Sequence, residues 1–91
     1  MSIEILHEPA AQRFVALVDG QECVIDYRLS GTTMTITHTG VPASLAGRGI
    51  ASELARFAFE KAKAEGWKVV PACSYVAAWI EKHPEYRELL A

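Results

Sequence analysis

The spacing of apolar residues changes abruptly within residues 38–51, which read HTGVPASLAGRGIA. Before this stretch apolar and polar residues alternate, as in a half-buried strand, and after it apolar residues recur every three or four positions, as on one face of a helix. Two glycines, Gly47 and Gly49, lie where that helix should begin. The expected buried stripe of the helix is Ile50, Leu54, Phe57, Ala58 and Ala62. The chain must therefore pass from a strand into a helix through a glycine-containing loop.

A helix start of this kind suits an anion. Its first backbone N–H groups have no partners within the helix, and they carry a partial positive charge. Glycine also allows the backbone to approach a ligand closely. We therefore expect this loop to hold the phosphate groups of a small ligand, although a G-x-G spacing alone does not say which one.

The patterns on either side of this junction predict an α+β domain. Asp19-Gly20 and Ser30-Gly31 are turn signals that join three strands into an antiparallel meander, and a strand after the long helix should return parallel to, or near, the third of them. In that third strand we expect Met34, Ile36 and His38 to share one face. The expected strands are 3–8, 13–18, 21–29, 32–38 and 67–71, and the expected helices are 48–65 and 74–82, with a further helical turn within 85–90.

Length and charge narrow the class of protein. A chain of 91 residues is expected to form a single domain, residues 1–91. Its net charge of −2 comes without a basic run, so neither nucleic acid nor an anionic membrane is an expected partner. No apolar segment of membrane-spanning length occurs, and the first residues lack a secretory pattern. With two cysteines that lack metal-ligand spacing, the sequence favours a cytoplasmic protein without a metal, a monomer or weak dimer.

Four short motifs occur in an order that resembles one known family. They are His38-Thr39-x-Val41-Pro42, Gly47-x-Gly49-Ile50-Ala51, Pro71-x-Cys73-Ser74-Tyr75-Val76 and His83-Pro84-Glu85-Tyr86. Across residues 12–90 the sequence is similar to the short members of the Gcn5-related N-acetyltransferase (GNAT) family. The resemblance implies a GNAT-like fold with a reduced N-terminal region, and acetyl-CoA as the co-substrate whose acetyl group is transferred to an amine.

The same resemblance implies where coenzyme A (CoA) would bind. The third strand and its following loop would face the pantetheine arm, and the helix start would surround the pyrophosphate through backbone amides. Ser44 replaces the Gln or Arg that the family places three residues before the first glycine, and Arg48 could supply the missing positive charge. The cofactor-binding residues implied are Ile36, His38, Thr39, Val41, Leu45, Gly47, Arg48, Gly49, Ile50, Ala51, Ser52, Cys73 and Ser74.

Three side chains are candidates for catalysis. Cys73 lies between a strand and a helix start, where the helix dipole favours the thiolate, so it could accept the acetyl group; it could equally fill a gap in the core. His38 could act as a general base or only hydrogen-bond the loop. Tyr75 matches the position of the tyrosine that protonates the leaving thiolate in many relatives, or its hydroxyl could cap a loop.

Three functions follow from these residues. The first is transfer of acetyl from acetyl-CoA to an unknown amine, either directly or through Cys73. The second is an acyl-CoA binding or sensing module with little catalysis, because the chain has no residues for the N-terminal helices that build the acceptor site in larger relatives and no clear counterpart of their carboxylate base. The third is an interaction domain in which the glycines only turn the chain.

Overall fold

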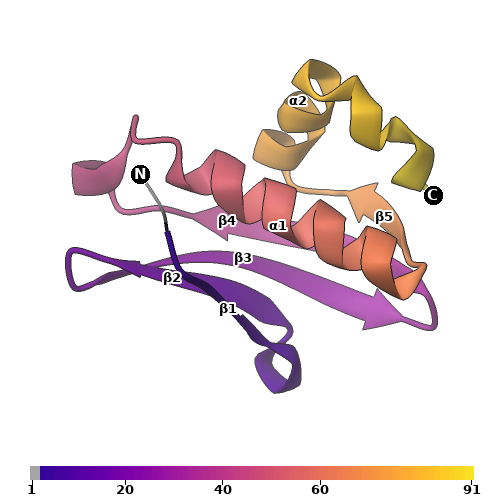
Figure 1. The fold of residues 1–91 in the computed structure, drawn as a ribbon, viewed down its shortest axis with the longest axis horizontal. Helices are drawn as coiled ribbons and strands as arrows, with labels where there is room; N and C mark the ends of the chain where they lie inside the picture. Colours follow the sequence, from indigo (N-terminus) through magenta and orange to yellow (C-terminus); the bar gives the residue numbers. More distant parts are fainter. Residues whose placement is uncertain (1–2) are drawn as a thin grey trace.

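A five-stranded sheet with the strand order β1-β2-β3-β4-β5 forms the base of the computed structural model, which describes residues 3–91 (Figure 1). Neighbouring strands are antiparallel except β4 and β5, which are parallel and are connected through α1. The strands are β1 (Ile5–Glu8), β2 (Arg13–Val18), β3 (Gln21–Ser30), β4 (Thr33–Gly40) and β5 (Lys68–Pro71). The helices are α1 (Ile50–Glu65) and α2 (Ser74–Lys82), with short 3-10 turns η1 (Pro9–Ala11), η2 (Ala43–Leu45) and η3 (Pro84–Leu89). The predicted α+β class, the antiparallel meander and the parallel strand after the long helix are confirmed.

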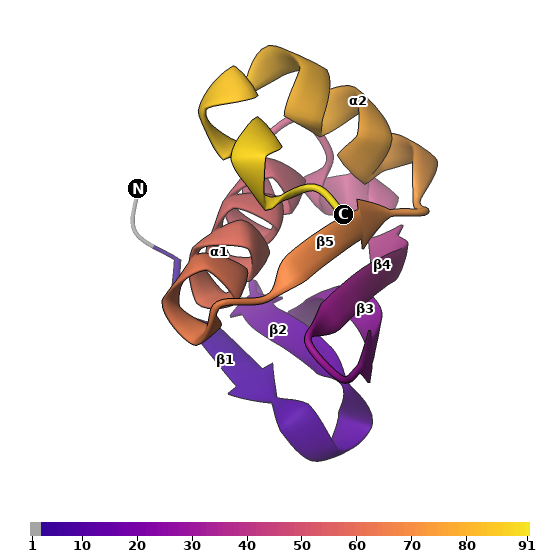
Figure 2. The same ribbon diagram turned by 90° about the vertical axis from the view of Figure 1, so that its right-hand side faces the viewer.

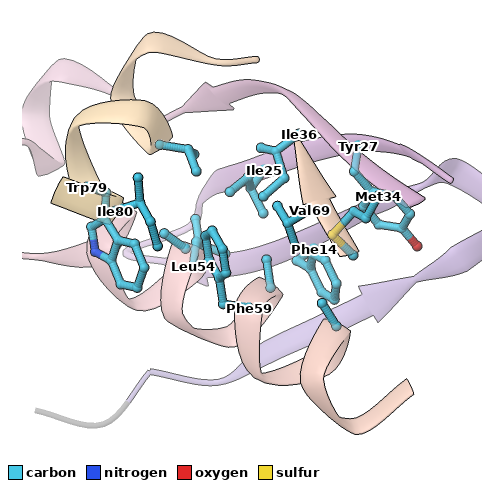
Figure 3. Close-up of a cluster of buried hydrophobic side chains, with 14 of the residues drawn as sticks. Phe14, Ile25, Tyr27, Met34, Ile36, Leu54, Phe59, Val69, Trp79 and Ile80 are labelled. Carbon is cyan, nitrogen blue, oxygen red and sulfur yellow. The ribbon is translucent and has the colours of Figure 1, made fainter. Parts of the chain in front are cut away.

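Both helices lie on the same side of the sheet (Figure 2). The sheet curves around α1, and α2 packs beside it above the ends of β4 and β5, so that all these elements share one hydrophobic core (Figures 1 and 3). The opposite face of the sheet, which we call the outward face, carries no helix within residues 3–91.

The start of α1 differs from the prediction by two residues. Helical geometry begins at Ile50 rather than Arg48, because Gly49 is the N-cap and adopts a left-handed backbone conformation (φ 79°). Gly47 is also left-handed (φ 83°). A left-handed backbone is unfavourable in free energy for residues with a Cβ atom. The two glycines therefore allow the chain to turn sharply into the helix.

A β-bulge in β4 overturns the predicted strand alternation. Tyr27 pairs with Ile36 but Asp26 pairs with His38, so Thr37 has no opposite residue. Cross-strand partners share a face, and Thr39 pairs with the buried Ile25. Thr39 therefore lies on the core side with Ile36, whereas His38 lies on the outward face. The expectation that His38 shares a face with Met34 and Ile36 was wrong, because a bulge inserts one residue and reverses every later side chain.

Four of the five residues predicted for the buried stripe of α1 are buried, but Phe57 is not, and the buried residues Ala55 and Phe59 were left out of the stripe. Phe59 is completely buried and stacks on Trp79 with ring centroids 5.3 Å apart, whereas Phe57 is 37% exposed. Phe57 instead contacts Phe14 edge-on at the margin of the core (5.5 Å). The difference arises because α2 covers a second side of α1, which extends the buried surface beyond a single sheet-facing stripe.

We expect Phe59→Ala to destabilise the protein by about 3–5 kcal/mol, because it removes a buried ring and leaves a cavity. Phe57→Ala should cost only about 1 kcal/mol, from the loss of one half-exposed aromatic contact. Urea denaturation of both variants measures the two losses. Equal losses would contradict the assignment of Phe59, and not Phe57, to the core between α1 and α2.

Candidate functional site

The loop before α1 presents a run of free backbone amides. Leu45 and Ala46 donate their N–H groups within the 3-10 turn η2, and the next amide that donates to a backbone carbonyl is that of Glu53, which bonds to Gly49 O (3.1 Å). Residues 47–52 thus donate no hydrogen bond to any backbone carbonyl of residues 3–91. No side chain caps the helix start either. Six consecutive amides, which we call the amide cradle, thus lie free at the positive end of a 16-residue helix, an arrangement that suits an anion.

Two contacts hold this loop against the β2–β3 hairpin. Arg48 Nη1 lies 2.8 Å from Asp19 Oδ2, an exposed ion pair. Gln21 Nε2 donates to Ser44 Oγ at 2.9 Å. Ser44, which replaces the basic or amide residue of the family pattern, therefore helps to fix the loop. The guanidinium of Arg48 is paired with Asp19, whereas the amides of residues 47–52 have no partner among the backbone carbonyls of residues 3–91.

A pocket of about 370 Å³ opens beside the amide cradle. It joins the loop, the first turn of α1 and the start of α2. Most of its lining was predicted from the sequence, but Ala46 was missed because it has no functional group to mark it. The lining residues are Val41, Leu45, Ala46, Gly47, Gly49, Ile50, Ala51, Ser52 and Tyr75.

The regular pairing of β4 with β5 ends near this pocket. Their pairing ends at Ile36 and Pro71, while β4 continues to Gly40. Beyond the last pair, the N–H group of Cys73 donates to Ile36 O (2.9 Å), and the Thr39 hydroxyl lies 3.4 Å from Cys73 Sγ. The bulge in β4 brings Thr39 to this position, so the predicted residues Ile36, Thr39 and Cys73 meet where the pairing ends. We call this end of the β4–β5 pairing the opening between the strands.

The surroundings of Cys73 favour its thiolate. Partial burial by itself would raise the pKa of the thiol, but the Thr39 hydroxyl and the backbone N–H groups of Val76, Tyr75 and Thr39 outweigh it and lower the pKa below its ordinary value. The other cysteine, Cys23, is fully buried, and burial raises its pKa. Only Cys73 therefore has the environment of a reactive thiol.

Thr39→Val should move the pH dependence of Cys73 alkylation to higher pH. The substitution keeps the shape of the side chain but removes the hydroxyl that stabilises the thiolate. The rate of iodoacetamide labelling at Cys73, followed by mass spectrometry between pH 6 and 10, measures the shift. Thr37→Val is the matched control, because the Thr37 hydroxyl bonds to Asp26 O and should leave the profile unchanged. An identical profile for Thr39→Val would show that this hydroxyl does not act on the sulfur.

Tyr75 and Ser52 face each other across the pocket lining. Burial raises the pKa of the Tyr75 phenol, although the Ser52 hydroxyl partly offsets this, so the phenol is protonated at neutral pH. Trp79 Nε1 donates to Ser52 Oγ (2.9 Å), which leaves the hydroxyl proton of Ser52 free to donate toward Tyr75. The sequence indicated Ser52 only as part of the helix start, because the partners of its hydroxyl, Trp79 and Tyr75, come from α2.

Two further predicted site residues, Ser74 and His38, do not line the pocket. Ser74 is the exposed first residue of α2 and does not line the pocket. His38 lies on the outward face, with its imidazole against Gly40. It is thus on the other side of the sheet from the pocket, yet on the strand that borders the opening between β4 and β5.

The described part of the chain, residues 3–91, has no helix long and apolar enough to cross a membrane. Within the same range, no three His, Cys, Asp or Glu side chains lie close enough together to hold a metal ion.

Comparison with known proteins identifies the class of protein that this fold and site define. A family model described as GCN5-related N-acetyl-transferase matches residues 13–89. The chain therefore belongs to the GCN5-related N-acetyltransferase family, a class of enzymes that generally uses acetyl-CoA as co-substrate.

Particular relatives agree with this assignment. Protein NATD1 of Xenopus tropicalis is 31% identical, over 98% of this chain and 86% of the relative. Protein NATD1 of Homo sapiens is 29% identical, over 97% of this chain and 82% of the relative. A GCN5-like protein from Staphylococcus aureus, solved by NMR in solution, has the same fold with a TM-score of 0.77 at 26% identity, over 97% of this chain and 87% of that one. The predicted GNAT-like fold and family are confirmed.

Proposed function

We propose that this protein binds acetyl-CoA at the loop before α1 and transfers the acetyl group to an amine. The observation that carries the proposal is the cradle of six free amides, residues 47–52, beside a pocket that ends at Tyr75. In this proposal the amides and the helix dipole hold the pyrophosphate. Arg48 contributes little directly, because Asp19 already compensates its charge.

The opening between β4 and β5 is the proposed place of the thioester. Cys73 and Tyr75 flank it from the start of α2, and the backbone of β4 beyond Ile36 has no β5 partner. The Cys73 thiolate would form a bond to the acetyl carbon as the C–S bond to CoA breaks. The departing sulfur keeps the electron pair and takes a proton from Tyr75. An amine then attacks acetyl-Cys73, the thiolate re-forms, and the amine's proton passes to a base.

Direct transfer is the alternative route within the same function. The amine would then attack the thioester itself, and Cys73 would only line the opening. Tyr75 would keep its role, because the leaving sulfur needs a proton in both routes.

A second candidate function is an acyl-CoA binding or sensing module. One observation favours it: no Asp, Glu or His is among the residues that line the pocket. Without a base the amine would not be deprotonated there, and bound acetyl-CoA would persist.

Titration calorimetry with CoA and acetyl-CoA, followed by mass spectrometry, tests both functions. We expect binding with a Kd well below about 1 mM and an acetyl group on the peptide that contains Cys73. Binding without either an adduct or transfer would favour the sensing module. No binding at millimolar ligand would refute both, and the glycine loop would then serve only to turn the chain.

A further inference from the structure

A second cavity, of about 310 Å³, lies on the outward face of the sheet. It has a polar lining, and neither the acetyl-CoA site nor the core explains it. Three irregular features meet in it: a strained residue, a pair of charges without ion-pair partners, and the bulge of β4. The lining residues are Ala11, Gln12, Asp26, Tyr27, Arg28 and Thr37.

Gln12 is the strained residue. Its backbone is left-handed (φ 53°), which is uncommon for a residue with a side chain and costs on the order of 1–3 kcal/mol. Three hydrogen bonds enforce this conformation. Gln12 N–H donates to Pro9 O (3.1 Å), Gln12 O accepts from Tyr27 N–H (2.9 Å), and its Oε1 accepts from Leu29 N–H (2.7 Å). The side-chain amide is thereby held at the cavity with its Nε2 group as a remaining donor.

Asp26 and Arg28 supply opposite charges to the cavity. They are two residues apart on β3 and therefore share its outward face. Neither forms an ion pair with any residue of the described range. Arg13, which lies opposite Asp26 on β2, directs its Nε to Glu8 Oε1 instead (2.7 Å). The cavity thus offers one anion and one cation to a ligand.

The bulge places this cavity next to the opening between β4 and β5. Thr37, which lines the cavity, directly follows Ile36, the last residue of β4 that pairs with β5. Adjacent strands are about 4.8 Å apart, so Asp26 on β3 lies about 10 Å across the sheet from the line of β5. His38, the cross-strand partner of Asp26, lies between them on the same outward face.

We propose that the outward cavity is the acceptor site and binds the zwitterionic head group of an amino acid that carries a second amine at the end of its side chain. Its α-ammonium would face Asp26, and its carboxylate would face Arg28 and the Gln12 amide. A side chain of about four methylene groups would span β4 and bring the second amine to the opening. The inference rests on the proposed function, because an acceptor needs an acetyl donor on the other side of the sheet.

In this proposal His38 accepts the proton that the amine loses during acetyl transfer. The side-chain amine nitrogen forms a bond to the carbonyl carbon of acetyl-Cys73 while the C–S bond to Cys73 breaks, and the Cys73 sulfur keeps the electron pair as a thiolate. The amine's proton passes to the His38 imidazole, the base on the side from which the amine arrives. Tyr75 protonates the CoA sulfur in the preceding step, so base and acid act from opposite faces of the sheet.

Amide NMR titration of the protein with L-lysine, with and without saturating CoA, tests the site. We expect lysine to shift the amide signals of residues 12, 26–28 and 37. Cadaverine, which lacks the carboxylate, and 6-aminohexanoate, which lacks the α-ammonium, should each bind about tenfold more weakly. Asp26→Asn and Arg28→Gln should each weaken lysine binding about tenfold. Glu22→Gln, which removes another outward carboxylate of β3 outside the cavity, should not.

The outcomes separate this inference from the proposed function. Calorimetry should give all three variants the CoA affinity of the unmodified protein, because none of the three residues touches the amide cradle. If CoA binds but lysine moves none of these signals, or the Asp26 and Arg28 variants bind lysine normally, the inference is overturned and the proposed function survives. If cadaverine binds as tightly as lysine, the carboxylate contact at Arg28 is wrong. If CoA itself does not bind, the proposed function fails independently of any lysine result.

Discussion

Gly49→Val is expected to weaken CoA binding by at least about a hundredfold. At φ 79° a β-branched side chain is strongly disfavoured, although no atom lies within 4 Å of the added Cβ. Relief of this strain requires the N-cap to rotate, and this rotation would reorient the free amides of residues 47–52. Loss of two charge-assisted hydrogen bonds, at about 1.5 kcal/mol each, accounts for that factor. Calorimetric titration with CoA measures it.

Gly31→Val is the matched control. Gly31 is also left-handed (φ 60°) with open space around it, but it lies in the β3–β4 turn, away from the pocket. Both variants should lose about 1–2 kcal/mol of unfolding free energy, whereas only Gly49→Val should lose CoA affinity. Arg48→Ala should weaken binding only a few-fold, because its guanidinium is paired with Asp19. A larger loss for Arg48→Ala than for Gly49→Val would mean that the backbone amides do not hold the ligand.

Local patterns predicted the order of the elements well. The alternation in the strands, the turn signals and the helical period depend on neighbouring residues, and they place the meander, α1 and the parallel β5 where the structure has them. The same local information marks the loop of free amides, because its two glycines lie directly before the helix pattern. The fold could therefore be predicted from the sequence, whereas the phosphate site stays a prediction.

The features that required the structure depend on contacts between distant segments. The bulge at Thr37 depends on the pairing of β4 with β3, and it decides that Thr39 rather than His38 faces Cys73. The bond from Trp79 to Ser52 links α2 to α1. Residue spacing along one strand cannot reveal an inserted residue, because the alternation of Thr33 to His38 looks regular in the sequence.

In the proposed site, the groups that would hold acetyl-CoA and those that would hold the acceptor lie on opposite faces of the sheet. The amide cradle, Cys73 and Tyr75 lie on the helix side of the opening, whereas His38 and the outward cavity lie on the other side. Within residues 3–91 no helix lies on this second face. If the acceptor binds there, the lack of an Asp, Glu or His in the lining of the pocket beside α1 does not argue against transfer, because the proton can leave on the acceptor's side.

Cys73→Ser is expected to remove the acetyl adduct and to slow acetyl transfer by about a thousandfold or more. A serine hydroxyl lacks the low pKa of this thiol, and the loss of a catalytic nucleophile costs at least that factor in enzymes that depend on one. Mass spectrometry after incubation with acetyl-CoA measures the adduct, and release of free CoA in the presence of an amine measures transfer. Cys23 is the internal control, because complete burial and its raised pKa should leave it unacetylated.

Tyr75→Phe distinguishes the covalent route from direct transfer. If acetyl passes through Cys73, the phenylalanine variant should form the adduct about a hundredfold more slowly, since CoA leaves in that step, but an adduct already formed should react with the amine at the normal rate. In direct transfer Cys73→Ser would retain full activity while Tyr75→Phe would still be slow. Full activity of Cys73→Ser would therefore assign Cys73 to the lining of the opening, and the lowered pKa of its thiol would be a by-product of its place at the start of α2.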